Sequence, residues 1–312
     1  APSRGPLLSE ENHPRESFLR GMSSSSHDAI IRIRNDPPDE LTGGAITSMT
    51  LRDIVNAFLI NELPADRRLK SLDIKIRFAI HSRQWVTFSV VAEMLGLDDE
   101  TVRRSLKRLV RTGWAECLDD SQLHKIGVDA GRGTSGQRKT VIAPWLPRDI
   151  EARVADHLSL VRWGSRPIGE WLMRCWLDLI VASRKYIDNS RPTWLRLPSA
   201  SAPLELDRDY PEERVGLEYQ GSHHFIKGGK YAQSQSDVNE QYERDCAKIG
   251  VCQRNNYTLI EVTRQDLSMS TMMEKVKGRL PLAYFREDGE IRLKLTEISE
   301  HYKSLAPRDD SD

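Results

Sequence analysis

The sequence lacks several features that define large classes of proteins. It has four cysteines and no CxxC pair, which argues against both a disulfide framework and a zinc knuckle. Its 46 basic and 46 acidic residues give a formal net charge of zero, so total charge neither favours nor excludes a nucleic-acid partner. No apolar run approaches the roughly 18 residues of a membrane helix, and no secretory apolar segment is present. We therefore expect a cytoplasmic protein without a membrane partner.

The length of 312 residues predicts two folded domains, and 29% charged residues are typical of a soluble protein. Residues 1–47 are polar, with Ser, Pro and Gly clusters, and predict a disordered or extended segment. Residues 48–148 and 149–304 carry different patterns and are predicted as the two domains. Residues 305–312 are predicted as a tail.

Residues 69–143 contain amphipathic segments separated by turn signals. Helices are predicted over 69–82, 87–95 and 100–112, the second ending at Gly96 and the third at Gly113. Asp98 and Asp99 supply an N-cap for the third helix. Strands are predicted over 114–118 and 139–143. This order resembles a winged helix-turn-helix whose third helix is the recognition helix.

The predicted recognition helix has no acid between positions 103 and 111. The basic residues there are Arg103, Arg104, Lys107, Arg108 and Arg111. The loop between the two strands adds Lys125, Arg132, Arg138 and Lys139. In the winged-helix resemblance these residues bind DNA, most simply double-stranded DNA, through its phosphates. The alternative is a solvated helix face without a partner.

A second pattern begins near residue 203. In a strand over 215–220, Val215, Leu217 and Tyr219 share one face while Glu218 and Gln220 share the other. A partner strand over 203–207, joined by a turn at 210–213, brings Asp207 to the same point of a hairpin. Two carboxylates beside a third polar side chain favour Mg²⁺ binding.

These residues resemble the active-site hairpin of the PD-(D/E)XK, or restriction-endonuclease-like, nuclease superfamily. The resemblance is to a subgroup written D…ExQG…H with a D-x-x-K helix, related to very-short-patch-repair endonucleases, and it covers about residues 165–267. It implies an α/β (α+β) fold, with a mixed sheet flanked by helices after the winged helix. It also implies Mg²⁺, or Mn²⁺ as a substitute, held by Asp207, Glu218 and the backbone carbonyl of Tyr219. The catalytic residues that it implies are Asp207, Glu218, Gln220, His224, Asp245 and Lys248.

Gln220 stands where most members of the superfamily have lysine, and it brings no positive charge. Lys248 replaces that lysine if the helix predicted over 240–251 directs it into the site. The alternative is a surface pair of Asp245 and Lys248. The core stripe of this helix is predicted to be Tyr242, Cys246 and Ile249.

One further candidate, Glu170, and the histidine already named, His224, each have an alternative role. Glu170, on an apolar helix over 167–181, is the candidate for an acid that reaches the metal site from this helix, and the alternative is a surface pair with Arg174. His224 follows a Gly-Ser turn and acts in catalysis, or simply occupies a polar loop. Near the end of the chain, residues 290–295 are predicted as a strand.

The sequence therefore predicts a metal-dependent DNA endonuclease, targeted by its winged helix and acting in defence, repair or a mobile element near the nucleoid. One alternative is a DNA-binding regulator with an inactive nuclease fold. Another is a homodimer or a subunit of a larger protein complex that cuts only with partners.

Overall fold

The computed structural model of the protein describes residues 49–81, 83–129, 131, 139–164, 167–197, 202–221 and 235–305, with the backbone alone at 161–164 and 235–242. The predicted N-terminal segment 1–47 lies outside these residues, as do Arg132, Arg138 and His224.

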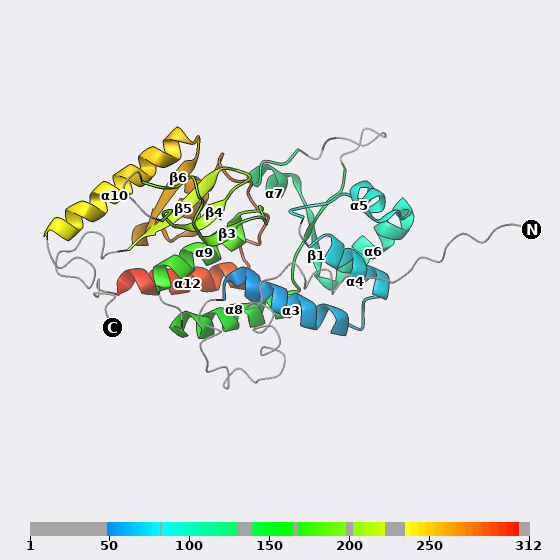
Figure 1. The fold of residues 1–312 in the computed structure, drawn as a ribbon. Coiled ribbons are helices and arrows are strands. Elements are labelled where there is room, and N and C mark those ends of the chain that lie inside the picture. Colours follow the sequence, from blue (N-terminus) through cyan, green and yellow to red (C-terminus); the bar gives the residue numbers. More distant parts are fainter. Residues whose placement is uncertain are drawn as a thin grey trace, which may run out of the picture.

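The N-terminal half is a group of helices joined to a two-stranded antiparallel sheet (Figure 1). Its elements are α3 (Leu51–Ala65), α4 (Ser71–Ala79), α5 (Phe88–Leu95), α6 (Asp99–Thr112), β1 (Ala115–Leu118), α7 (Asp120–Lys125) and β2 (Val141–Pro144). The three predicted helices and both predicted strands are present, with small shifts at their ends. The loop predicted between the strands contains α7, whose start is capped because Asp119 accepts a hydrogen bond from the Gln122 amide.

The turn between α5 and α6 forms as its capping residues predict. Gly96 ends α5 in the left-handed region, with φ 63°, and the Asp98 side chain accepts from the Thr101 amide at the start of α6. Gly113 ends α6 with φ 84°, and a Cβ there would lie 3.1 Å from the Cα of Pro147. Glycine is therefore required at 113 both for conformation and for space.

The C-terminal half contains a four-stranded mixed sheet between helices. Its elements are α8 (Arg148–Gly164), α9 (Ile168–Ile180), β3 (Ile187–Ser190), β4 (Leu206–Tyr210), β5 (Val215–Gln220), α10 (Gln235–Arg254), β6 (Thr258–Thr263), the short 3₁₀ turn η3 (Arg264–Asp266), α11 (Met269–Val276) and α12 (Glu290–Ser304). The strand order is β3-β4-β5-β6, with the first two pairs antiparallel and the last parallel. In Figure 1, α10 lies on one side of this sheet and α9 with α12 on the other.

The strand predicted over 290–295 is wrong, because these residues begin helix α12. A strand would place Ile291, Leu293 and Leu295 on one face. Instead Leu293 is 45% exposed, while Ile291, Leu295 and Ile298 are buried at helical spacing. The short alternation fits both periods, and only the continuation to Ile298 separates them.

One hydrophobic cluster joins the two halves. Helix α3 packs against both α8 and α9, and the Trp171 indole donates to the Met49 carbonyl at 2.8 Å. The same cluster includes Ile54 on α3 and Trp176 on α9, both fully buried. The core therefore runs across residue 148, and the chain has a mixed α/β (α+β) fold.

Candidate functional site

The register of β4 and β5 brings the two predicted acids together. Arg208 pairs with Leu217, so the next positions outward are Asp207 and Glu218, which lie opposite each other on one face. The backbone amide of Tyr219 donates to the Asp207 carboxylate at 2.6 Å. On the other face, a Cβ at Gly169 of α9 would overlap the Tyr219 ring, so α9 packs closely there.

Lys248 of α10 faces these acids. Its ammonium lies 2.6 Å from Glu218 Oε1 and donates to the backbone carbonyl of Glu205 at 2.5 Å. The side chain is 12% exposed, so the alternative of a surface lysine is wrong. Asp245, one turn earlier, is half-buried, and its negative charge helps to raise the pKa of Glu218.

The core stripe predicted for α10 is wrong at Cys246, which is exposed. Among the described side chains of the helix, the buried ones are Val251 and Cys252, which pack with Leu206 of β4. This rotation turns Lys248 toward the sheet. The side chain of Tyr242 lies outside the described residues.

Burial dominates the electrostatics of the two acids. It raises the pKa of Glu218 to about 7, although the Lys248 charge opposes the shift and the Asp207 charge adds to it. Burial also raises the pKa of Asp207, against the Tyr219 amide and the charges of Arg174 and Lys248. Removing charged carboxylates from water raises their pKa in this way, and a nearby cation reverses the shift.

Gln220 lies beside a further acid. Its amide nitrogen donates to Glu261 Oε1 at 3.2 Å, and its own Oε1 is buried without a hydrogen-bond partner among the described residues. Glu261 pairs with Glu218 in the parallel β5–β6 register. Sequence analysis missed Glu261, although the alternation in the strand over 257–263 places it on one face with Thr263.

Glu170 and Arg174 form the ion pair that their spacing predicts, but it is not a surface pair. The Arg174 and Glu170 side chains are 14% and 19% exposed, and burial raises the pKa of Glu170. Arg174 also donates to the Asp207 carbonyl at 3.1 Å and to Asn189 at 2.8 Å. The pair is thus held at the start of β4, next to the predicted metal site.

A buried arginine lies directly after Asp207, and sequence analysis missed it. Arg208 is fully buried, 2.7 Å from both Asp178 of α9 and Asp188 of β3. Its guanidinium stacks 3.9 Å from the centre of the Tyr186 ring. In the sequence Arg208 alternates with the apolar Leu206 and Tyr210, which does not show that an arginine is buried between them. The partners that allow its burial, Asp178 and Asp188, are distant in sequence.

The basic helix α6 presents most of its cations to solvent. Arg103, Arg104, Lys107 and Arg111 are exposed, and we call these four residues the basic face of α6. Glu100 pairs with Arg103 and Arg104 at 3.7 and 3.1 Å. Lys139 is also exposed, while Lys125 pairs with Glu287 at 2.6 Å.

The fifth cation, Arg108, is half-buried and turned toward α4. It lies 2.5 Å from the buried carboxylate of Asp73 on α4. Its assignment to the DNA contact is therefore corrected to a structural ion pair. The sequence pattern did not reveal this, since Asp73 is 35 positions away.

In the part of the chain that the structure describes, no group of three or more His, Cys, Asp or Glu residues could hold a metal ion. An ion between Asp207 and Glu218 would thus have two carboxylate ligands. Nor does any helix in the described ranges have the length and apolar character to cross a membrane.

The fold and site define a mixed α/β protein with two adjacent, half-buried carboxylates beside a half-buried lysine. The chain is 38% identical over 71 residues to uncharacterized protein 094L of Frog virus 3 (isolate Goorha), covering 21% of this chain and 43% of that protein. It is 33% identical over 108 residues to uncharacterized protein 033L of Invertebrate iridescent virus 3, covering 35% and 56%. Uncharacterized protein 307L of Invertebrate iridescent virus 6 is 32% identical over 137 residues, covering 41% of this chain and 70% of that protein.

The chain therefore belongs to the same family as protein 307L of Invertebrate iridescent virus 6. It spans about half the length of the first two relatives. No protein family model matches the sequence, and no solved structure is similar to it.

Proposed function

We propose that this protein is a metal-dependent DNA endonuclease of the PD-(D/E)XK type. The observation that carries the proposal is the position of Lys248, 2.6 Å from Glu218 on the face that Glu218 shares with Asp207. A lysine reaching the two acids from the neighbouring helix supplies the cation that Gln220 does not. The mixed sheet between helices supports the same assignment.

The donor set fits Mg²⁺. This ion commonly takes one or two protein carboxylates and keeps several waters, completing its shell with substrate phosphate oxygens. Asp207, Glu218 and the backbone carbonyl of Tyr219 would be its ligands, and Mn²⁺ would substitute. A divalent cation would also compensate the charge that burial disfavours on both acids. That no third carboxylate joins these two as a metal ligand among the described residues is therefore compatible with Mg²⁺.

Each residue of the site then has its own role in phosphodiester hydrolysis. When bound, the metal lowers the pKa of water and stabilises the charge developing on the phosphate. Gln220 orients the attacking water through its amide, whose Oε1 is buried without a partner in the described region. Lys248 balances negative charge on the phosphate, and Arg174 holds Glu170 and the Asp207 carbonyl in place. His224 acts as a general acid in this proposal.

The N-terminal half would hold the DNA. The helix α5, turn, helix α6 and the β1–β2 hairpin are in the order of a winged helix-turn-helix. The exposed basic face of α6 and Lys139 would contact phosphates of double-stranded DNA, which makes binding dependent on salt. Arg132 and Arg138 would extend this contact.

One observation favours a second function, that of a DNA-binding regulator with an inactive nuclease fold. The Lys248 ammonium already neutralises Glu218 and donates to Glu205, so it acts as a permanent counter-ion if no metal displaces it. Such a protein binds DNA and does not cut it. A homodimer, or a complex with partners that complete the site, is a related alternative.

The two functions are separated by incubating the purified protein with supercoiled, linear and single-stranded DNA, in Mg²⁺, Mn²⁺ or EDTA. The endonuclease cuts at least one substrate with either metal and none in EDTA. A protein that binds DNA but leaves every substrate intact in both metals contradicts the proposal.

A further inference from the structure

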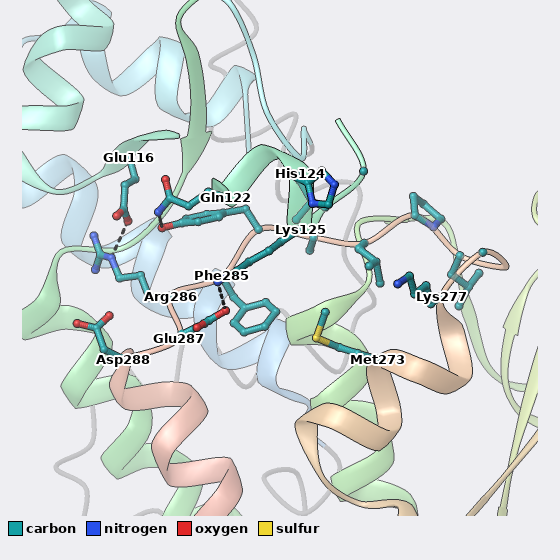
Figure 2. Close-up of a pocket in the computed structure, with 18 residues that line it drawn as sticks. Glu116, Gln122, His124, Lys125, Met273, Lys277, Phe285, Arg286, Glu287 and Asp288 are labelled. Carbon is teal, nitrogen blue, oxygen red and sulfur yellow. Dashed lines mark hydrogen bonds and ion pairs between the residues drawn. The ribbon is translucent and has the colours of Figure 1, made fainter. Parts of the chain in front are cut away.

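A cavity of about 810 Å³ lies between the end of α7 and the segment from α11 to α12, far along the chain from the acids (Figure 2). Its volume is within the range of ligand pockets, about 300–1,000 Å³. One wall is formed by Glu116, Gln122 and residues 124–127 at the end of α7, and the other by Met273, Lys277, Gly278 and residues 280–288. The N-terminal and C-terminal halves thus both contribute to it.

The acids that line this cavity are all paired with cations. Glu116 accepts from Arg286 at 2.7 Å, and Glu287 lies 2.6 Å from Lys125. Asp288 lies 2.8 Å from Arg148. No acid of the lining therefore carries uncompensated negative charge.

One lysine and one histidine of the lining are left over. Neither Lys277 nor His124 has an ion-pair or hydrogen-bond partner among the side chains that the structure describes, and both are exposed. They belong to different walls of the cavity, and in Figure 2 His124 lies above its centre and Lys277 to the right. The cavity therefore favours a ligand with negative charge.

Apart from Gln122, whose amide donates to the Tyr284 hydroxyl at 3.1 Å, most of the remaining lining is apolar, and it includes aromatic rings. Phe285, Met273 and Ile126 are half-buried, each packing one side against the hydrophobic core and leaving part of its surface to the cavity. Figure 2 shows Phe285 and Met273 below the centre of the cavity. Aromatic and sulfur-containing side chains of this kind bind flat aromatic groups well.

We propose that this cavity binds a nucleotide unit, with its base against Phe285 and Met273 and its phosphate at Lys277 and His124. A nucleotide combines an aromatic base, which can pack against Phe285 and Met273, with a negatively charged phosphate. The same chemistry is offered by a free mononucleotide and by one nucleotide of a single strand. The proposal does not require hydrolysis at Asp207 and Glu218.

The test measures binding of dAMP and dTMP by calorimetry, and of a fluorescein-labelled eight-residue oligothymidylate by anisotropy, all in EDTA. The variants are Lys277→Glu, whose side chain is exposed and should not disturb folding, and Phe285→Leu, which stays apolar but loses the ring. Lys75→Glu makes the same charge change at an exposed position of α4 and is the matched control.

We expect Lys277→Glu and Phe285→Leu each to weaken binding about tenfold or more, the size of a lost stacking or phosphate contact. Lys75→Glu should leave the binding of both probes unchanged. Binding of a mononucleotide identifies a free nucleotide as a ligand. Binding of the oligonucleotide alone identifies a strand in this cavity when Lys277→Glu and Phe285→Leu both weaken it. Failure of both probes to bind overturns the proposal, as does equal binding by the parent and Lys277→Glu. Because EDTA excludes cleavage, neither result depends on nuclease activity.

Discussion

The raised pKa of Glu218 makes metal binding at the proposed site depend on pH near neutrality. A metal ligand must be deprotonated, so a proton on Glu218 competes with Mg²⁺. With a pKa of about 7, the carboxyl is about 90% ionised at pH 8 and about 10% ionised at pH 6. The apparent affinity for Mg²⁺ or Mn²⁺ should therefore fall about tenfold between these pH values. The raised pKa of Asp207 acts in the same direction.

The assay is calorimetric titration of Mn²⁺ at pH 6, 7 and 8, with the Glu218→Gln variant in parallel. The glutamine keeps the shape of the side chain and does not titrate, so its binding should be weak and nearly constant across the range. Glu212→Gln, in the turn at the other end of the same hairpin, is the matched control and should behave like the parent. An affinity in the parent that does not change between pH 6 and 8 would refute the assignment of Glu218 as a ligand with this pKa.

Further predictions concern Lys248, the basic helix α6 and the stability of the folded protein. Lys248→Ala should lose nearly all cleavage and Lys248→Gln should not recover it, whereas Gln220→Lys in the Lys248→Ala background should regain part of the rate, measured on a labelled duplex. Reversing Arg103, Arg104 and Lys107 to glutamate should weaken DNA binding and flatten its salt dependence without a change in melting temperature; unchanged binding would mean that this face is only solvated. Arg108→Ala should instead destabilise the fold, on the order of 3 kcal/mol, because it leaves the buried Asp73 carboxylate unpaired; a denaturant midpoint equal to that of the parent would contradict the pair. Finally, Glu218 binds a proton more tightly in the folded state, with a pKa of about 7 against an ordinary 4.5, so its contribution to metal-free stability should fall as pH rises between these values, by at most roughly 3 kcal/mol. Chemical denaturation in EDTA checks this, and Glu218→Gln should reduce the fall.

The helices and the hairpins could be predicted where local chemistry decides the structure. Gly96, Asp98 and Gly113 fix the ends of α5 and α6 through capping and left-handed φ values, which depend on the nearest residues alone. The Asp207–Glu218 juxtaposition was also predictable, since a hairpin with a short turn leaves few registers.

The predictions failed where residues that are distant in sequence determine which side chains are buried. α10 is long and weakly amphipathic, so its sequence did not show that Val251 and Cys252, and not Cys246, face the sheet. Arg108 reads like its exposed neighbours until Asp73 of α4 is brought beside it. The burial of Arg208 between Asp178 and Asp188 likewise depends on three separate elements, and no local pattern reports it.

The most direct test of the central claim is the single-turnover rate of cleavage of a DNA duplex at saturating protein, in Mg²⁺ and in EDTA. We predict cleavage by the parent in Mg²⁺ only, and a loss of about 10³-fold or more in Asp207→Ala and Glu218→Ala with DNA binding retained. Glu212→Ala, which removes an exposed carboxylate from the same hairpin, should cut like the parent. A parent that binds the duplex but does not cut it in Mg²⁺ or Mn²⁺, or acid variants that cut at the parental rate, would contradict the account.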